Sequence, residues 1–148
     1  MALNTDRIGA TYEPYSYEVT RAKIREYARA VGEDDPRYFS DGDDCVAPPT
    51  FAATFTIIQP GELLLADAAL GMHWNLVHGN QAFEFGDRPL RPGDVVTCTP
   101  KVADIRTRGA NEMLTIEVDC RFPDGSTAVT STNLLVLLGS APGQEASA

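Results

Sequence analysis

The chain has 148 residues, of which 43% are hydrophobic and 22% are charged, which is typical of one globular domain with a single core. Its formal net charge of −9 argues against a nucleic-acid partner, because nucleic-acid binders present a basic surface. No stretch is apolar and long enough to span a bilayer, and the first ten residues lack a signal-peptide pattern. The three cysteines are odd in number and form no CxxC pair, so we expect no zinc site, no disulfide framework and a reducing, cytoplasmic setting.

The first predicted element is an amphipathic helix over residues 17–32. Apolar residues recur there at helical spacing, at Ile24, Tyr27, Ala28 and Val31. Thr20 is a suitable N-cap, and Gly32 is a suitable stop.

A loop over residues 33–48 follows, and a second helix is predicted over residues 48–61. Pro49 suits the first turn of this helix, Thr50 can cap it, and Pro60-Gly61 ends or bends it. Its threonine and isoleucine content weakens the helix pattern, because β-branched residues favour strands.

The second half of the chain reads as strands. Residues 80–85 alternate, with Phe83 and Phe85 on one face, and residues 94–107 form a long strand with Val96, Cys98 and Val102 on one face. Residues 112–122 alternate most cleanly, and residues 126–138 return as the last strand after a Pro-Asp-Gly turn. Helices followed by antiparallel strands indicate an α+β domain over residues 1–138, and the small, polar residues 139–148 are expected to be a disordered tail.

Three stretches of the chain resemble a known family. They are YSYEVTRAKIREYARAVGEDDPRYF (15–39), VAPPTFAATF (46–55) and LVHGNQAFEFGDRPLRPGDVV (76–96). These words are similar to the MaoC-like, hot-dog hydratases and dehydratases of (R)-specific acyl-thioester chemistry. They are most similar to the N-terminal or non-catalytic branch, which includes the partner subunits of heterodimeric (3R)-hydroxyacyl dehydratases.

The resemblance implies a hot-dog fold, in which an antiparallel sheet wraps one helix and two such units pair into a double hot dog. It implies reversible addition of water across a trans-2-enoyl thioester, which requires polarisation of the thioester carbonyl and general acid–base catalysis. Active members carry an Asp and a His in a Gly-Asp-x-Asn-Pro-x-His word, and a His-Gly pair that presents a backbone N–H to the carbonyl. No cofactor and no metal are implied.

This chain departs from both words. Glu33 stands at the catalytic Asp position and Tyr38 at the His position, and a one-residue shift would offer Asp34 instead. A phenol with a pKa near 10 is a poor base at pH 7. Where active members have His-Gly the chain has Pro48-Pro49, and proline has no N–H, so the donor is missing or moved to Thr50 or Phe51. A solvated helix-end corner is the simplest alternative for residues 33–35, and packing under the loop is the alternative for Tyr38.

Other candidate residues follow from the resemblance or from charge. Thr50, Phe51, Phe55, His78 and Asn80 are the expected substrate-binding residues, with core packing as the alternative for the two phenylalanines and a structural hydrogen bond for His78. Asp41, Asp43 and Asp44 lack the glycine and distal glutamate of a calcium loop, which favours a solvated loop over a metal site. Five basic residues could meet the phosphates of coenzyme A or of a carrier-protein arm, or simply belong to a mixed surface: Arg88, Arg91, Lys101, Arg106 and Arg108.

Three functions therefore remain open. The favoured one is a substrate-binding, non-catalytic subunit of a 3-hydroxyacyl-thioester dehydratase, whose partner is a catalytic MaoC-like chain and whose ligand is an acyl-coenzyme A or acyl-carrier-protein thioester. The second is a self-sufficient homodimeric hydratase or thioesterase that uses Glu33, Asp34 or His78. The third is a non-enzymatic acyl-thioester binding module.

Overall fold

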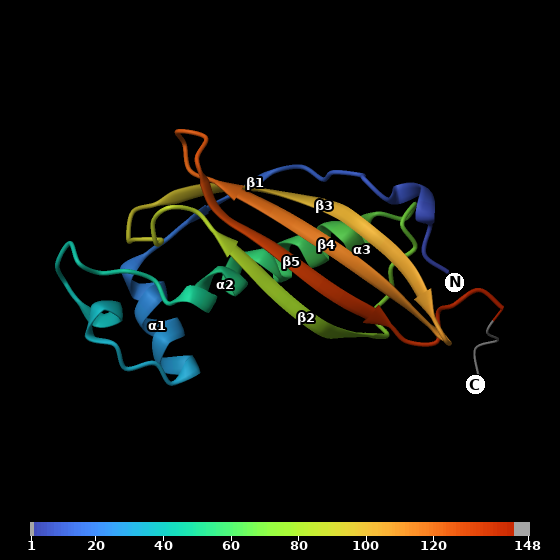
Figure 1. Cartoon of the computed structure of the whole chain (residues 1–148), viewed down its shortest axis with the longest axis horizontal. Coiled ribbons are helices and arrows are strands. Elements are labelled where there is room, and N and C mark those ends of the chain that lie inside the picture. Colours follow the sequence, from blue (N-terminus) through green and yellow to red (C-terminus); the bar gives the residue numbers. More distant parts are fainter. Residues whose placement is uncertain (1, 144–148) are drawn as a thin grey trace.

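The computed structural model describes residues 2–143 and contains one antiparallel sheet. Its strands are β1 (Tyr15–Glu18), β2 (Leu76–Phe85), β3 (Val95–Arg108), β4 (Asn111–Arg121) and β5 (Thr127–Leu137). Their spatial order is β1-β3-β4-β5-β2, so β2 and β1 form the two edges. Figure 1 shows the strands curving around a helix that crosses the sheet.

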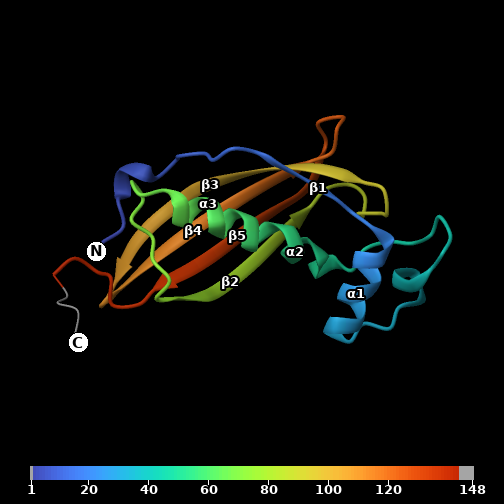
Figure 2. The ribbon, with the colours of Figure 1, turned by 180° about the vertical axis from the view of Figure 1, so that it is seen from behind.

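Helices account for the first half of the chain. α1 (Arg21–Val31) lies at one end of the molecule, followed by the short 3-10 turns η2 (Pro36–Phe39) and η3 (Pro49–Ala52). α2 (Ala53–Thr56) and α3 (Ile58–Ala66) then run along the concave face of the sheet (Figure 2). A further 3-10 turn, η1 (Thr5–Arg7), lies in the N-terminal segment. The helix on a curved antiparallel sheet confirms the predicted α+β class and is the hot-dog arrangement.

The inward faces of the two long central strands are as predicted. Val96, Cys98 and Val102 of β3 are fully buried. On β4 and just beyond it, the buried residues are those that alternate in the sequence: Leu114, Ile116, Val118, Cys120 and Phe122. The regular alternation of β4 determined this outcome, because a strand that covers a helix must place every second side chain inward.

The first helix confirms its predicted caps and corrects its stripe. The Thr20 side chain accepts a hydrogen bond from the Lys23 N–H, and Gly32 ends the helix at φ 77°. Ile24 and Ala28 are buried, but Val31 is 48% exposed, because the chain turns away from the core at Gly32. The helix was predicted to begin at residue 17, but Tyr17 and Glu18 belong to β1, which pairs with β3.

Pro60-Gly61 was predicted to end or bend the second helix, and the helix does not end there. It is interrupted earlier, at Ile57, and α3 continues to Ala66. The cause is Pro60, whose ring occupies the space in which the carbonyl of Thr56 would accept an intrahelical bond. Thr50 does not cap this helix either, since Pro48 stands at the cap position of η3 without a side-chain hydrogen bond.

The packed part of the chain extends past residue 138. Ser140 and Ala141 are buried, and the Ala141 N–H donates to the Ala110 carbonyl over 3.1 Å. Within the predicted tail of residues 139–148, positions 144–148 lie outside the described residues. No helix between residues 2 and 143 is long and apolar enough to cross a membrane.

Candidate functional site

The loop that follows α1 contains the three consecutive acidic residues 33–35. The Glu33 N–H donates to the Ala28 carbonyl over 2.9 Å, which completes the helix C-cap, and the side chains of Glu33 and Asp34 are exposed. Asp35 caps η2 by accepting from the Arg37 N–H and forms an ion pair with the Arg37 guanidinium at 2.7 Å. The three acids therefore point to solvent or to a local partner.

Tyr38, which the resemblance matches to a catalytic histidine, is packed in the interior and is not presented to solvent. It is 8% exposed and belongs to the core. Burial raises the pKa of Tyr38, and the nearby charges of Glu33 and Asp35 raise it further. The phenol is therefore neutral at pH 7 and offers no base.

The rest of the loop is held by two arginines of α1. Arg25 pairs with Asp41 at 2.6 Å and donates to the Phe39 carbonyl over 3.0 Å. Arg21 donates to the Ser40 carbonyl, and the Ser40 hydroxyl donates to the Asp44 carboxylate. Among the described residues no group of three or more His, Cys, Asp or Glu side chains has a metal-site arrangement.

The Pro48-Pro49 segment lies against α1. Tyr27 of α1 hydrogen-bonds the Thr50 hydroxyl at 2.8 Å and donates to the Thr50 carbonyl over 3.0 Å. The Phe51 N–H donates to the Pro48 carbonyl over 2.9 Å, so this amide is already engaged and cannot polarise a thioester. Thr50 thus remains as the one relocated donor that the sequence offered.

Phe51 and Phe55 build an aromatic cluster. Both are fully buried, and Phe55 stacks on Tyr17 at 4.5 Å while Tyr27 meets Phe51 edge-on at 5.7 Å. Neither phenylalanine lines the two cavities described next. In this structure both residues therefore have the role that was the alternative to substrate binding, which is packing in the core.

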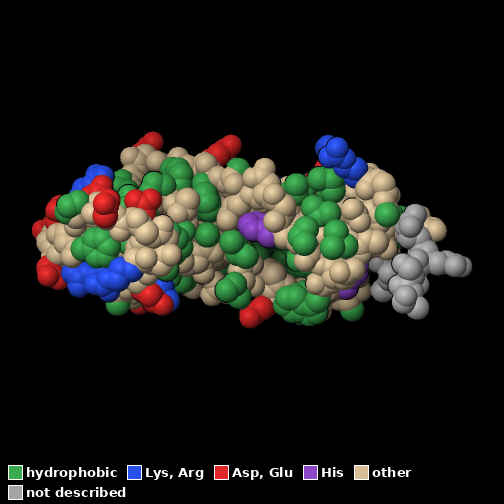
Figure 3. Space-filling model, turned by 90° about the horizontal axis from the view of Figure 1, so that it is seen from below, with side chains coloured by type: hydrophobic (Ala, Val, Ile, Leu, Met, Phe, Trp, Pro, Cys, Tyr) green, Lys and Arg blue, Asp and Glu red, His purple; other side chains and the backbone are tan. Residues whose placement is uncertain are grey.

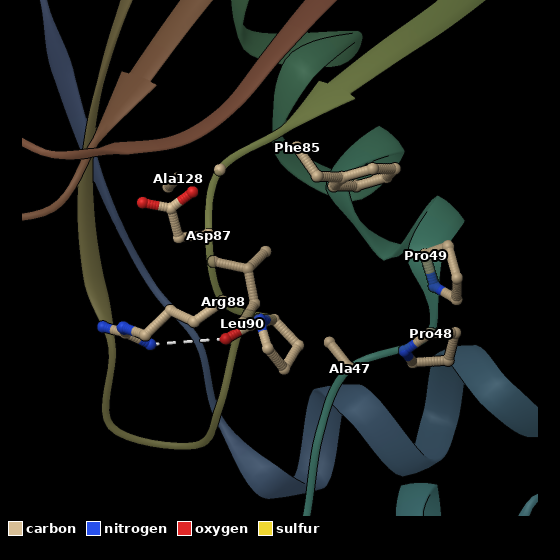
Figure 4. Close-up of a pocket in the computed structure, with 10 residues that line it drawn as sticks. Ala47, Pro48, Pro49, Phe85, Asp87, Arg88, Leu90 and Ala128 are labelled. Atoms are coloured by element: carbon tan, nitrogen blue, oxygen red, sulfur yellow. Dashed lines mark hydrogen bonds between the residues drawn. The ribbon is translucent and has the colours of Figure 1, made fainter.

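The first cavity opens beside the two prolines and encloses about 300 Å³. Its walls are almost entirely apolar and come from the η3 segment and from the end of β2 and the loop after it: Ala47, Pro48, Pro49, Phe85, Pro89 and Leu90. Figure 4 shows the Phe85 ring and the two prolines facing this space, and the Arg88 guanidinium pointing away from it. The cavity suits an apolar group. On its helix side, Pro48 and Pro49 have no backbone N–H and therefore offer no hydrogen-bond donor.

The second cavity lies further along the helix, at the interruption between α2 and α3. It is small, about 20 Å³, and lies between Thr56, Ile57, Pro60 and Leu64 of the helix and His78, Asn133 and Leu135 of the sheet, with Ile116 beneath. His78 therefore lines a cavity, although a different one from that beside Pro48-Pro49. Asn80 is exposed on β2, past a bulge at Gly79 where the register with β5 shifts.

The predicted residues thus separate into two groups. Tyr27 joins Thr50 to α1, the helix that leads into the 33–38 loop. His78 and Asn80 lie on β2, where His78 lines the second cavity and Asn80 is exposed. None of Glu33, Asp34 and Tyr38 lines either cavity. Sequence reasoning missed Gln81, Ser131 and Asn133. The available signal was the polar residues at positions 131 and 133, on a strand face whose other inward residues, Val129, Leu135 and Leu137, are apolar.

Most of the basic residues proposed for phosphate binding have local partners. Arg88 pairs with Asp94 at 2.8 Å and lies 3.7 Å from the Phe122 ring centre. Lys101 pairs with Glu117 at 3.0 Å, and Arg106 pairs with Asp104. These pairs spread over the outer face of the sheet and its loops, as a mixed surface does.

Comparisons with known proteins agree with this architecture. A family model described as the FAS1-like dehydratase domain region matches residues 6–130. A UPF0336 protein of Thermobifida fusca is 41% identical over 151 residues, covering 96% of this chain and 98% of that protein. A UPF0336 protein of Streptomyces griseus is 37% identical and covers 92% of this chain and 95% of its own length.

Solved structures extend the comparison. A chain of the C-terminally truncated HadBC (3R-hydroxyacyl-ACP dehydratase) complex from Mycobacterium tuberculosis superposes with a TM-score of 0.74 at 27% identity, over 90% of this chain and 99% of that chain. The MaoC-like dehydratase from Rhodospirillum rubrum shares the fold, with a TM-score of 0.60 at 20% identity, over 90% and 94% of the two chains. The chain belongs to the FAS1-like dehydratase region family and has the hot-dog fold of MaoC-like dehydratases.

Proposed function

We propose that this chain is the substrate-binding, non-catalytic subunit of a (3R)-3-hydroxyacyl-thioester dehydratase, and that a separate MaoC-like chain supplies the acid–base pair. The main support is that residues at both catalytic motifs have structural roles. Tyr38 is buried at the position matched to the family's histidine, and the Phe51 N–H donates to the Pro48 carbonyl. Proton transfer therefore lacks an acid–base pair in this loop, and Thr50 is the one relocated donor left for carbonyl polarisation.

The surface around β2 supports a partner subunit. β2 is an edge strand, and large hydrophobic side chains lie exposed on it and beside it: Ile58 (66%), Trp74 (79%), Val77 (48%) and Phe85 (53%). Figure 3 views the molecule from this side and shows hydrophobic side chains along its length. Exposed, apolar sheet edges are normally covered. The similar HadBC protein is a complex of two different subunits, which favours a second hot dog at this edge.

The ligand of the proposal is an acyl thioester. The two cavities follow one another beneath the β2–β5 side of the sheet, the first at the Pro48-Pro49 end and the second at the helix interruption. An acyl chain lying along the helix would pass from one to the other. The HadBC complex is a 3R-hydroxyacyl-ACP dehydratase, and a carrier-protein or coenzyme A arm is the corresponding proposal here.

The test is hydration of enoyl thioesters by the isolated chain and by its complex with a MaoC-like chain that has an intact Gly-Asp-x-Asn-Pro-x-His word. We expect the isolated chain to be inactive on crotonyl-coenzyme A and on longer enoyl thioesters, and the complex to be active. Glu33→Ala and Asp34→Ala should leave the activity of the complex nearly intact. Substitution of the partner's own Asp should abolish it, which is the matched control.

Three outcomes would replace the proposal. General acid–base catalysis is worth about 10²–10⁴-fold, so a fall of that size in Glu33→Ala or Asp34→Ala would assign catalysis to this loop. Turnover by the isolated chain that is lost in His78→Ala would favour a self-sufficient hydratase or thioesterase. Thioester binding without any activating partner would favour a non-enzymatic module.

A further inference from the structure

The interruption of the central helix releases a backbone carbonyl, and one buried amide captures it. The Thr56 carbonyl, which Pro60 deprives of its helical partner, accepts from the Asn133 Nδ2 over 3.2 Å. The same Nδ2 donates to the Ser131 hydroxyl oxygen over 3.3 Å. Since only the NH₂ end of an amide can donate to a carbonyl, these contacts fix the orientation of the Asn133 side chain.

The other end of this amide is left without a partner. Asn133 is 5% exposed, and within residues 2–143 its Oδ1 is a buried atom with no hydrogen-bond donor. A buried acceptor that loses its hydration without a replacement bond is destabilising, and native proteins satisfy most such atoms. Asn133 lines the second cavity, so a group that enters and widens this cavity comes close to the unsatisfied acceptor.

The surrounding contacts occupy the neighbouring polar groups and leave that one acceptor. Gln81 Nε2 donates to the Ser131 hydroxyl oxygen over 3.3 Å and lies 3.4 Å from the Thr56 hydroxyl oxygen. The Thr56 hydroxyl donates to the Ala52 carbonyl over 2.9 Å. The remaining walls, from Ile57, Pro60, Gly61, Leu64, Ile116 and Leu135, are apolar, and His78 adds an imidazole ring. The cavity thus combines a mostly aliphatic lining with one buried, unsatisfied acceptor and one histidine.

We propose that this cavity binds a part of the acyl chain that carries a hydroxyl group, and that the hydroxyl donates to Asn133 Oδ1. The inference rests on the proposed acyl-thioester function and adds a substrate class to it. Thr56 lies seven residues beyond Pro49, which corresponds to roughly 10 Å along a helix with a rise of 1.5 Å per residue. The hydroxyl recognised here is therefore distal, well separated from the thioester, and distinct from the 3-hydroxyl that the reaction removes.

The cavity's size decides what must happen on binding. Its volume of about 20 Å³ accommodates one water molecule, which is the occupant expected in the absence of ligand. A hydroxyl group can replace that water and reproduce its bond to Asn133, whereas a methylene group cannot. Entry of a chain requires the cavity to widen, and the wall at the helix interruption, where Ile57 has φ −112° and ψ −61°, lacks a continuous helical hydrogen-bond ladder.

The test compares three coenzyme A thioesters of equal chain length, by isothermal titration of the protein in complex with its partner. One chain ends in a hydroxyl group, one is unsubstituted, and one carries a methyl ether, which cannot donate. We expect the hydroxylated chain to bind about tenfold more tightly than the other two, as one satisfied hydrogen bond to a buried acceptor allows. Asn133→Leu should remove the preference, and Thr132→Val, on the opposite face of the same strand, should keep it.

Each result bears on the proposal. Equal affinities for the hydroxylated and unsubstituted chains would overturn it and leave the acyl-thioester function standing, with water as the cavity's occupant. Binding of none of the thioesters would overturn both. A preference that survives Asn133→Leu, or that the methyl ether shares, would assign the recognition to another group. The ether comparison uses the wild-type chain, so it decides the matter even if the Asn133 variant does not fold.

Discussion

Asp67 shows how single side chains fasten the N-terminal segment to the end of the central helix. Arg7 forms an ion pair with it at 2.7 Å, and the Tyr12 hydroxyl donates to it over 2.8 Å. Burial opposes ionisation of Asp67, but the hydrogen bonds from Tyr12, Arg7 and the Ala69 N–H outweigh it and hold the pKa of this carboxyl below its usual value. Burial, together with the bond to Asp67, raises the pKa of Tyr12 to about 12.

Asp67→Asn should therefore destabilise the fold in a pH-dependent way. A carboxyl with a lowered pKa in the folded state contributes stability above its unfolded pKa of about 3.9, and this contribution disappears as the pH falls through the folded value. We expect a loss of about 1–2 kcal/mol at neutral pH, limited by the partial exposure of Arg7. Urea unfolding should show the stabilities of the two proteins converging as the pH falls through the lowered pKa of the folded Asp67 carboxyl.

Tyr12→Phe is the matched control for that substitution. It removes one donor and leaves the Arg7 ion pair, so it should cost less than Asp67→Asn at neutral pH. On the alkaline side its difference from wild type should fade as the pH rises from about 10 towards 12, since the neutral phenol is the form that the fold favours. A gap between Asp67→Asn and wild type that stays constant down to pH 2 would contradict the assignment.

The residue scale also shows what sequence can and cannot foresee. The sequence alone showed that Glu33 and Asp34 depart from the catalytic motif of the family that the chain resembles. Both residues lie exposed on the loop. The burial of Tyr38 and the capture of the Phe51 amide depend on how the loop folds back, which no local pattern encodes. Asn133 was missed because its partner, the Thr56 carbonyl, is 77 residues away and becomes available only through Pro60.

At the scale of elements, β4 is the segment that the sequence described best. Ile116 lies at mid-strand, is 2% exposed and contacts the space beneath the central helix. Ile116→Ala should lower the free energy of unfolding by about 2–5 kcal/mol, because it removes buried carbon atoms and enlarges an existing cavity. Chemical denaturation measures this loss, and Thr115→Ala on the outward face should change stability by less than about 0.5 kcal/mol.

Two glycines give a sharper contrast between elements. A Cβ on Gly86, at the end of β2, would lie 1.8 Å from the Thr127 carbonyl oxygen, so backbone must move to accept it. A Cβ on Gly61, within α3, meets nothing within 4 Å. Gly86→Ala should cost at least about 1–3 kcal/mol, and Gly61→Ala should stabilise by about 0.5–1 kcal/mol. Thermal unfolding of the pair should move in opposite directions, and equal shifts would refute the close approach at Gly86.

The elements that sequence misjudged share a physical reason. Residues 15–18 pair with β3 although the residues after them have helical periodicity. This strand was not predicted because four residues are too few to show an alternating pattern. Pro60-Gly61 was predicted to end or bend the helix, and the sequence did not decide between the two: the proline acts on the carbonyl four residues before it, and the helix resumes. Periodicity identifies long elements, and tertiary contacts decide the short ones.

For the whole molecule, the main expectation is association through the β2 edge. The purified chain, alone or with its partner, should sediment as a dimer at micromolar concentration. Val77→Lys places a charge among the exposed apolar side chains and should weaken association by about tenfold or more. Val31→Lys, at a similarly exposed position on α1, should have no effect, and a stable monomer in both proteins would refute the edge as an interface.

The buried position of Tyr38 also has an evolutionary consequence. Tyrosine and histidine codons differ only in their first base, so the imidazole of an active relative is a single mutation away. The phenol, however, now fills part of the core, and a histidine in its place would leave a gap and would be desolvated, which lowers the pKa of an imidazole. The first step back towards catalysis would therefore lower stability before any chemistry returned. Under the proposed function, this packing would make the loss of the imidazole difficult to reverse, and the chain would stay dependent on its catalytic partner.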